Sequence, residues 1–147
     1  PECRLKGAYL IRCVGYETDE NGHVARVLAS YDPDSRGGDP ADGRKVKGAT
    51  IHWVDAATAV DAECRLYDDL FLDESPDAAD KDFMACLNPN SLEVVTGCKV
   101  EAGLKDALAP ASFQFMRIGY FCLDSRDSRP GHLVFNRSVG LKDSFKK

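Results

Sequence analysis

Short apolar segments alternate with turn-forming residues along this chain, and this pattern restricts its possible folds more than any other feature. The segments are rich in Val, Ile, Tyr and Phe, which favour β-strands, and Gly, Pro, Asn or Asp separate most of them. About seven strands of this kind, with little helix between them, are typical of a β-barrel or a β-sandwich. The expected strands are residues 4–14, 23–31, 44–54, 60–71, 92–100, 112–124 and 133–139.

The first two expected strands are joined by a strong hairpin signal. Residues 17–22 (ETDENG) are polar, and Asn21-Gly22 is the dipeptide most typical of a two-residue β-hairpin turn. We therefore expect the two flanking strands to pair as a hairpin. The next segment, residues 32–43 (DPDSRGGDPADG), is predicted to be a long surface loop, and such loops are often functional.

Residues 44–54 (RKVKGATIHWV) are expected to form a strand that begins with three basic residues. Side chains alternate from face to face along a strand. One face would therefore carry Lys47, Ala49, Ile51 and Trp53. His52 and Trp53 are expected to be core and hydrogen-bonding residues rather than contacts for a ligand.

The middle of the chain is less regular. Residues 60–71 fit either a strand or an amphipathic helix, and we favour the strand. Residues 75–87 (SPDAADKDFMACL) favour a short helix, because Ser75 can cap it and Pro76 suits the first helical position. Acidic residues in the first turn of this segment support the same interpretation.

The common signatures of catalysis are absent from the sequence. It contains no G-x-S-x-G motif and no Gly-rich phosphate-binding loop. The three histidines lie in unrelated contexts, and none of the six cysteines forms a C-x-x-C pair, so no metal site is expected. The cysteines are expected to be reduced thiols that pack as small apolar residues. The acidic residues of 61–82 could supply a carboxylate pair, but a solvated acidic face is the preferred interpretation.

The negative charge of the chain is concentrated in one segment. The net charge is −5, whereas residues 55–90 alone hold ten acidic and two basic residues, which gives −8. Residues 1–54 are neutral overall, and residues 91–147 carry +3. Exposed charges farther apart than about 8 Å are largely screened at physiological salt, so an acidic total does not exclude RNA as a ligand. No apolar run reaches the roughly 18–20 residues that span a bilayer, and no secretion signal is visible, so we expect a cytoplasmic protein without a membrane partner.

At residues 41–57 (ADGRKVKGATIHWVDAA) the sequence resembles the C-terminal anticodon-binding region of bacterial-type glutaminyl-tRNA synthetases, which are class I aminoacyl-tRNA synthetases. Further stretches agree with that region in order and spacing, from Glu2 to Phe145. They are RLKGAYLI near the start, YDPD (31–34), RLYDDLF (65–71), NPNSLEVV (88–95), FQFMRIGYFCLDSRDS (113–128) and VFNRSVGLKDSF (134–145). The glutamyl enzymes of the archaeal and eukaryotic type share the theme of residues 43–54 and are a competing interpretation. An L25-like ribosomal RNA-binding barrel and a protein-interaction barrel are further alternatives.

The resemblance implies a mostly β fold of one or two small antiparallel six-stranded barrels of the ribosomal protein L25-like type, with one or two short helices. Residues 1–147 would form the anticodon-binding region, divided into a distal barrel part (1–72) and a proximal barrel part (73–147). The catalytic domain would lie outside this chain, and the start at Pro1 fits a piece of a longer protein. That domain would use ATP with magnesium, whereas no cofactor and no catalytic residue are expected here. The implied partners are the tRNA for glutamine, through its anticodon loop, and the catalytic domain of the same, monomeric enzyme.

Two basic residues near the start would contact the first anticodon base. In the family, both basic residues of an R-L-R segment have this role, and the matching segment here is Arg4-Leu5-Lys6. A spacing of two on a strand would put Arg4 and Lys6 on one face, with Leu5 in the core. Lys6 departs from the family pattern. Lysine keeps the charge but lacks the planar guanidinium fork, so a phosphate contact is equally consistent.

Gln114 and Arg117 match the family residues that read the middle base, uracil, and the third base, guanine. A carboxamide offers an acceptor and two donors to a uracil edge, and Arg is the natural bidentate partner of guanine. Phe113 and Phe115 are expected to point inward and to leave Gln114 exposed. On an ideal strand Gln114 and Arg117 would face opposite sides, so a bulge, a strong twist or a strand end near Gly119 is needed if both touch RNA.

A second basic cluster, for which phosphate contact and a solvated strand entry are both open, consists of Arg44, Lys45 and Lys47. The complete set of expected RNA-binding residues is Arg4, Lys6, Arg44, Lys45, Lys47, Gln114 and Arg117. The interpretation requires Arg4, Gln114 and Arg117 to converge on one exposed surface that can hold three unpaired nucleotides.

Overall fold

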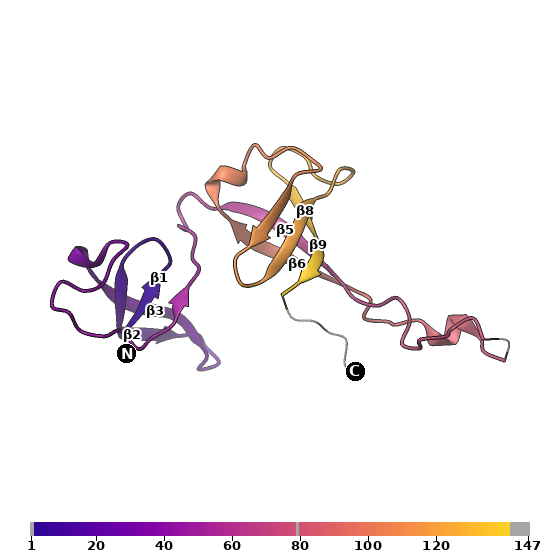
Figure 1. Cartoon of the computed structure of the whole chain (residues 1–147), viewed down its shortest axis with the longest axis horizontal. Helices are drawn as coiled ribbons and strands as arrows, with labels where there is room; N and C mark the ends of the chain where they lie inside the picture. Colours follow the sequence, from indigo (N-terminus) through magenta and orange to yellow (C-terminus); the bar gives the residue numbers. More distant parts are fainter. Residues whose placement is uncertain (1, 79, 142–147) are drawn as a thin grey trace. The chain divides into compact units, whose positions relative to one another are not determined.

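The chain divides into two compact units, and the boundary in the sequence lies between Trp53 and Val54 (Figure 1). The computed structural model describes residues 2–78 and 80–141. The expected division after residue 72 lies later in the chain than this boundary. The strand at residues 60–67 pairs only with strands of the second unit, and this pairing places it there.

Unit 1 contains a four-stranded sheet in the order β3-β2-β1-β4. Its elements are β1 (Glu2–Leu5), β2 (Leu10–Thr18), β3 (Val24–Asp32), the 3₁₀ turn η1 (Pro33–Ser35) and β4 (Thr50–Ile51). Strand β1 runs antiparallel to β2 and parallel to β4. The predicted hairpin is confirmed, because β2 pairs antiparallel with β3 and Gly22 has the positive φ of 80° that such turns need.

Residues 4–14, expected as one strand, form two strands with a reversal between them. Gly7 adopts a φ of 69°, and the Ala8 N–H donates to the Leu5 carbonyl at 3.0 Å. Strand-forming residues continue on both sides of the turn, so the apolar pattern shows no break there. The glycine was the one local signal of this turn.

Residues 44–54 form much less strand than expected, because only Thr50 and Ile51 pair with a neighbour. The shared face of Lys47, Ala49, Ile51 and Trp53 is therefore absent. A Cβ at Gly48 would overlap the backbone carbonyl of Glu2, so this segment lies directly against β1. Trp53 is 42% exposed, which corrects its expected place in the core, and His52 is also exposed. The expected hydrogen bond of Trp53 is present, since its Nε1–H donates to the Lys6 carbonyl at 3.1 Å.

Unit 2 contains a five-stranded sheet in the order β6-β5-β9-β8-β7. Strands β5 and β9 are parallel, and the other neighbours are antiparallel. The elements are β5 (Val60–Tyr67), η2 (Phe83–Cys86), β6 (Leu92–Val100), η3 (Ala102–Leu104), β7 (Ser112–Phe115), β8 (Gly119–Leu123) and β9 (Leu133–Gly140). Strand β5 confirms the strand interpretation of residues 60–71, and β6 has the expected bounds.

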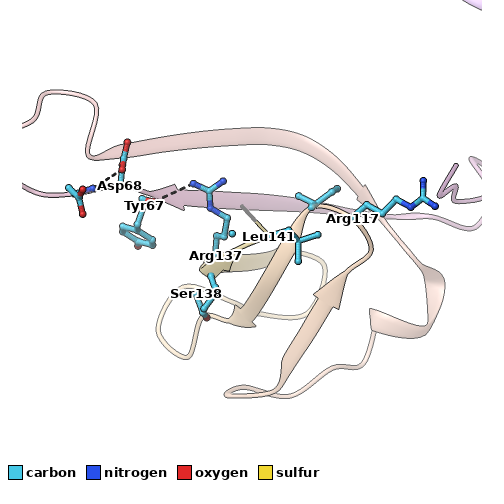
Figure 2. Close-up of a pocket in the computed structure, with 10 residues that line it drawn as sticks. Tyr67, Asp68, Arg117, Arg137, Ser138 and Leu141 are labelled. Carbon is cyan, nitrogen blue, oxygen red and sulfur yellow. Dashed lines mark hydrogen bonds between the residues drawn. The ribbon is translucent and has the colours of Figure 1, made fainter. Parts of the chain in front are cut away.

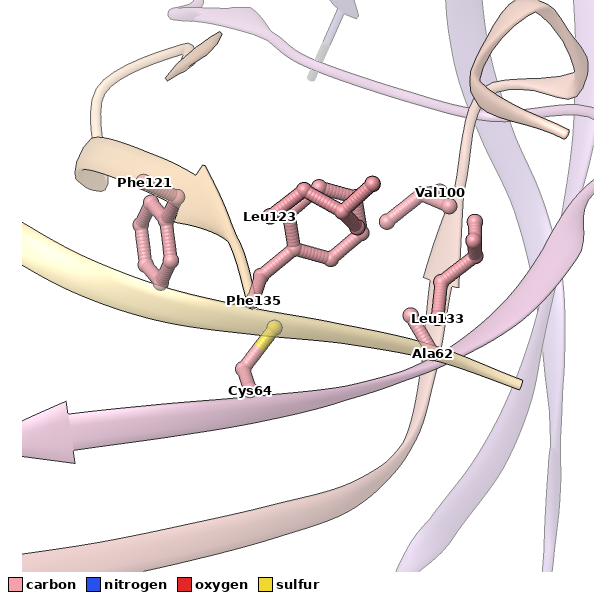
Figure 3. Close-up of a cluster of buried hydrophobic side chains, with 7 residues drawn as sticks. All are labelled: Ala62, Cys64, Val100, Phe121, Leu123, Leu133 and Phe135. Carbon is pink, nitrogen blue, oxygen red and sulfur yellow. The ribbon is translucent and has the colours of Figure 1, made fainter. Parts of the chain in front are cut away.

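One cluster of buried side chains holds unit 2 together (Figure 3). Its members are Ala62, Cys64, Val100, Phe121, Leu123, Leu133 and Phe135. Phe115 extends this cluster, because its ring stacks on Phe121 with centroids 4.3 Å apart and meets the edge of Phe135 at 5.1 Å. Burial raises the pKa of the Cys64 thiol to about 12, so this sulfur packs as an apolar group.

Two expected elements of unit 2 differ from the structure. Residues 112–124, expected as one strand, form the β7–β8 hairpin with a turn at 116–118. The helix expected at 75–87, of which residue 79 lies outside the described residues, is reduced to η2. Asp82 rather than Ser75 caps η2, since its side chain accepts from the Met84 N–H. Residues 68–78 and 80–91 extend from the sheet as a narrow arm (Figure 1), where a short helix has no apolar face to pack against.

The expected mostly β fold is confirmed, but the sheets differ from the expected six-stranded barrels. Within residues 2–78 and 80–141 the sheets have four and five strands, and neither closes on itself. The helical content of these residues consists of the three 3₁₀ turns, none long enough to cross a bilayer.

Candidate nucleic-acid interface

Arg4 lies in β1 and holds the long loop of unit 1. One guanidinium nitrogen donates to the Gly38 carbonyl, and another lies 3.5 Å from the Asp39 carboxylate. The side chain of Arg4 is 21% exposed. The loop thus orients the guanidinium of Arg4 and leaves part of it accessible to a ligand.

Lys6 lies outside β1, in the turn that follows it. The strand ends at Leu5, which is half-buried, so the expected alternation along Arg4-Leu5-Lys6 does not extend to Lys6. The backbone N–H of Lys6 donates to the Ile51 carbonyl at 2.9 Å, and its carbonyl accepts from Trp53. These two bonds fix the backbone, while the side chain of Lys6 is exposed.

Arg44 is surrounded by three carboxylates. Its Nε lies 3.1 Å from Glu2, one terminal nitrogen lies 2.9 Å from Asp32, and the other contacts Asp42. Hydrogen bonds from Arg44 and Arg12 hold the pKa of Glu2 below its usual value. The donors of Arg44 are thus used within the protein, and this residue ties the end of the loop to β1 and β3.

The two lysines that follow Arg44 are in a different position. Lys45 and Lys47 are exposed and, within the described part of the chain, have no ion-pair partner. They can therefore approach a phosphate without breaking a bond inside unit 1.

Gln114 has the predicted orientation on β7. Phe113 and Phe115 pack against the core of unit 2, and Gln114 between them is exposed. Its backbone is in register with Tyr120 of β8. A rigid hairpin therefore presents the carboxamide to solvent.

Arg117 lies at the centre of the turn between β7 and β8. The Ile118 N–H donates to the Phe115 carbonyl at 2.9 Å and closes this turn. The φ of Arg117 is 63°, and among the described residues it is the one non-glycine with a positive φ. Such a conformation costs on the order of 1 kcal/mol or more and is often retained at functional sites. Strand β7 ends at Phe115, and a strand end was one of the three ways expected to let Gln114 and Arg117 reach the same ligand. Because Arg117 lies beyond this end, the alternation of side chains along the strand does not apply to it.

Arg117 also borders an open groove of about 580 Å³ in unit 2 (Figure 2). Tyr67 at the end of β5 and Asp68 after it line the groove on one side, and residues 137–141 at and just after the end of β9 line it on the other. This volume is in the range of small-molecule binding sites. Sequence reasoning missed Tyr67 and Arg137. Both fall in stretches that show the resemblance, but the parallel pairing of β5 with β9, which brings them together, leaves no local pattern.

The structure brings some of the expected residues together. Gln114 and Arg117 share one hairpin of unit 2. The other expected contacts all lie in unit 1, namely Arg4, Lys6, Arg44, Lys45 and Lys47. The convergence of Arg4 with Gln114 and Arg117 stays a prediction. No group of three or more His, Cys, Asp or Glu side chains in residues 2–78 and 80–141 is arranged to hold a metal ion.

Known proteins that resemble this chain include a domain family of tRNA synthetases and several tRNA ligases. A sequence profile described as "tRNA synthetases class I (E and Q), anti-codon binding domain" matches residues 50–124, about half of the chain. The "Glutamine--tRNA ligase" of Vibrio cholerae serotype O1 is 52% identical over 146 residues, which are 99% of this chain and 26% of that protein. The protein of the same name from Cupriavidus taiwanensis is 54% identical over 145 residues, 98% of this chain and 24% of that protein. The chain thus spans about a quarter of the length of these curated relatives.

Proposed function

Because the chain belongs to the anticodon-binding domain family of class I (E and Q) tRNA synthetases, we propose that it reads the anticodon of the tRNA for glutamine. The observation that carries this proposal is the β7–β8 hairpin, which presents Gln114 and Arg117 within the region matched by the family. In the whole protein, a separate catalytic domain would use ATP and magnesium to attach glutamine to the tRNA. We place this activity in the cytoplasm and expect the enzyme to act as a monomer.

The hairpin suits the recognition of unstacked bases. The exposed carboxamide of Gln114 can pair with a uracil edge through its acceptor and its donors. Arg117 can donate two hydrogen bonds to the acceptor edge of guanine, a contact that contributes about 1–3 kcal/mol of discrimination between bases. Phe113 and Phe115 anchor the hairpin in the core, which lowers the entropy lost on binding.

Unit 1 would hold the first anticodon base and the loop backbone. The loop at Gly38 and Asp39 orients Arg4, so its guanidinium already has a fixed direction in which to contact one base. Lys6 offers a charge without a planar fork, which suits a phosphate. Lys45 and Lys47 are further phosphate contacts in this proposal, and Arg44 acts by holding the loop in place.

The choice of glutamine over glutamate comes from the relatives. The family description covers both E and Q enzymes, whereas the curated relatives named above are glutamine ligases. Charging assays of the intact enzyme on the two tRNAs separate these activities.

Binding to isolated RNAs tests the proposal on the chain itself. We expect the chain to bind an anticodon stem-loop with central uracil and third-position guanine more tightly than stem-loops altered at either base. Fluorescence anisotropy at low and physiological salt measures these affinities. Tighter binding to a 5S ribosomal RNA fragment would favour the L25-like alternative, and no RNA binding even at low salt would refute an RNA-reading role.

A further inference from the structure

The groove of unit 2 extends beyond Arg117, and its other end contains a second arginine. Figure 2 shows Arg117 at one end, and Arg137 beside Tyr67 and Asp68 toward the other. The recognition of three anticodon bases uses Arg117 and leaves this second end without a role.

Arg137 has the features of a prepared anion-binding group. One terminal nitrogen donates to the Tyr67 carbonyl at 3.3 Å, which restricts the rotamer of the side chain. Among the described residues Arg137 has no carboxylate partner, whereas Arg44 and Arg65 are each paired with several. Its remaining N–H groups can therefore bind a phosphate without breaking an ion pair.

Tyr67, whose backbone carbonyl Arg137 contacts, lines the same groove and carries an aromatic ring. Tyr67 is 47% exposed, and its hydroxyl donates to the Asn136 side-chain oxygen at 3.3 Å. This bond limits the motion of the ring at the groove wall. Bases of any identity stack on such a ring, because every base has a π face.

The carboxylates at the same end narrow the choice of ligand. Asp68 and Asp69 also line the groove, and the Asp69 N–H donates to the Asp68 carboxylate at 2.9 Å. Two negative charges oppose the binding of a free anion. A nucleotide adds base stacking to the phosphate contact and can overcome this repulsion.

We propose that Arg137 and Tyr67 bind the nucleotide that adjoins the one read by Arg117. Arg137 contacts the phosphate of this nucleotide, and Tyr67 stacks on its base. The contact is independent of base identity, and it rests on the proposed function because the same RNA strand must already occupy the Arg117 end of the groove.

The salt dependence of binding tests the phosphate contact. The chain carrying Arg137→Ala should bind the glutamine anticodon stem-loop about tenfold more weakly. The slope of log affinity against log salt concentration should fall by about 0.7, the value for one phosphate of a single strand. Arg126→Ala is the matched control, because Arg126 is an exposed arginine of unit 2 outside the groove.

Paired tyrosine variants test the stacking contact. Tyr67→Phe keeps the ring and loses the hydroxyl bond, so it should retain most of the affinity. Tyr67→Leu keeps an apolar side chain without the ring and should bind about tenfold more weakly. Thermal melting of each variant identifies losses that come from unfolding, and Arg137→Lys, which keeps the charge, should recover part of the affinity lost in Arg137→Ala.

The outcomes separate this inference from the proposed function. If wild-type chain discriminates between anticodons and Arg137→Ala or Tyr67→Leu behaves like Arg126→Ala, the second subsite is refuted and anticodon reading stands. If wild-type chain shows no preference among anticodons, the proposed function itself fails. A loss in Arg137→Ala that depends on the third anticodon base contradicts a phosphate contact.

Discussion

Arg117 combines an exposed side chain with a left-handed backbone conformation, so substitutions at this residue are the most informative tests of the proposed function. Replacing Arg117 with Ala should lower the discrimination between guanine and other third bases by about 1–3 kcal/mol. Binding to stem-loops that differ only at this base measures the effect. Equal losses on every stem-loop would show an electrostatic contact without base reading.

The matched variant Arg117→Gly separates backbone strain from recognition. Glycine accepts a φ of 63° without steric cost, so this variant should lose discrimination as Arg117→Ala does. It should also be more stable than Arg117→Ala, by about 1 kcal/mol, in denaturant unfolding.

Asp124 connects the stability of unit 2 to pH. Its carboxylate accepts from the backbone N–H groups of Asp127 and Arg126, each at 2.8 Å, and from the Asn136 side chain. These bonds lower the pKa of Asp124 from 3.8 to about 2, and Arg65 at 3.9 Å contributes in the same direction. A carboxyl group whose pKa is lowered by folding stabilises the protein above its unfolded pKa. This stabilisation is lost as the pH falls from about 4 to about 2.

We expect Asp124→Asn to lower the free energy of unfolding at pH 7 by about 1–2 kcal/mol. The difference between the variant and wild-type chain should shrink as the pH approaches 2. Urea unfolding at several pH values measures both effects, and a difference that is constant across this range would contradict the role of the ionised carboxylate.

At the scale of elements, Gly119 sets the distance between β8 and β9. A Cβ at this position would lie 2.6 Å from the Val139 carbonyl oxygen and 3.6 Å from the Cδ of Arg137. We therefore expect Gly119→Ala to destabilise unit 2 by about 1–3 kcal/mol, as overpacking does. Gly103→Ala is the control, because a Cβ at Gly103 meets no atom within 4 Å. Similar stabilities of the two variants in denaturant would show that β8 can move without cost.

The predictability of each element depended on whether its signal was local. The turn at Asn21-Gly22 and the strand at residues 92–100 were correct from sequence, because turn chemistry and strand propensity act over a few residues. A strand end near Gly119 was only one of three options for residues 112–124, because Arg117, unlike glycine, gives no sign of the positive φ that forms the turn at 116–118. The helix expected at 75–87 followed good capping rules, yet a short helix also needs an apolar surface to pack on.

On the scale of the whole molecule, the two units differ in the size of their cores. Among the described residues of unit 1 the buried apolar ones are Ala8, Leu10 and Pro40, whereas unit 2 buries a cluster that includes Phe121 and Phe135. Burial of apolar area contributes most of the stability of a fold. Unit 1 should therefore unfold at lower denaturant concentration than unit 2.

The single tryptophan makes this order measurable. Trp53 belongs to unit 1, so its fluorescence should report an earlier midpoint than far-UV circular dichroism, which reports both sheets. Leu123→Ala, which cuts into the core of unit 2, should shift the later transition and leave the fluorescence midpoint unchanged. Coincident transitions in wild-type chain would show that the units unfold together.

The sequence predicted properties of single site residues, but it did not predict which residues come together to form a surface. Gln114 was correctly expected to face solvent because the two neighbouring phenylalanines face the core. Arg44 belonged to a basic cluster in the sequence, but in the structure it is surrounded by the neighbouring Asp42 and by Glu2 and Asp32 from more distant positions. The groove beside Arg137 depends on strands that are far apart in the chain and adjacent only after folding.

The two residues proposed to read the middle and third bases occupy one short hairpin, residues 112–123, whose ends are adjacent in the sheet. Under the proposed function, preference for two of the three bases is thus encoded in a single contiguous stretch. Exchange of that stretch between related enzymes is then a modular route to altered codon assignment, and it leaves the rest of the scaffold intact.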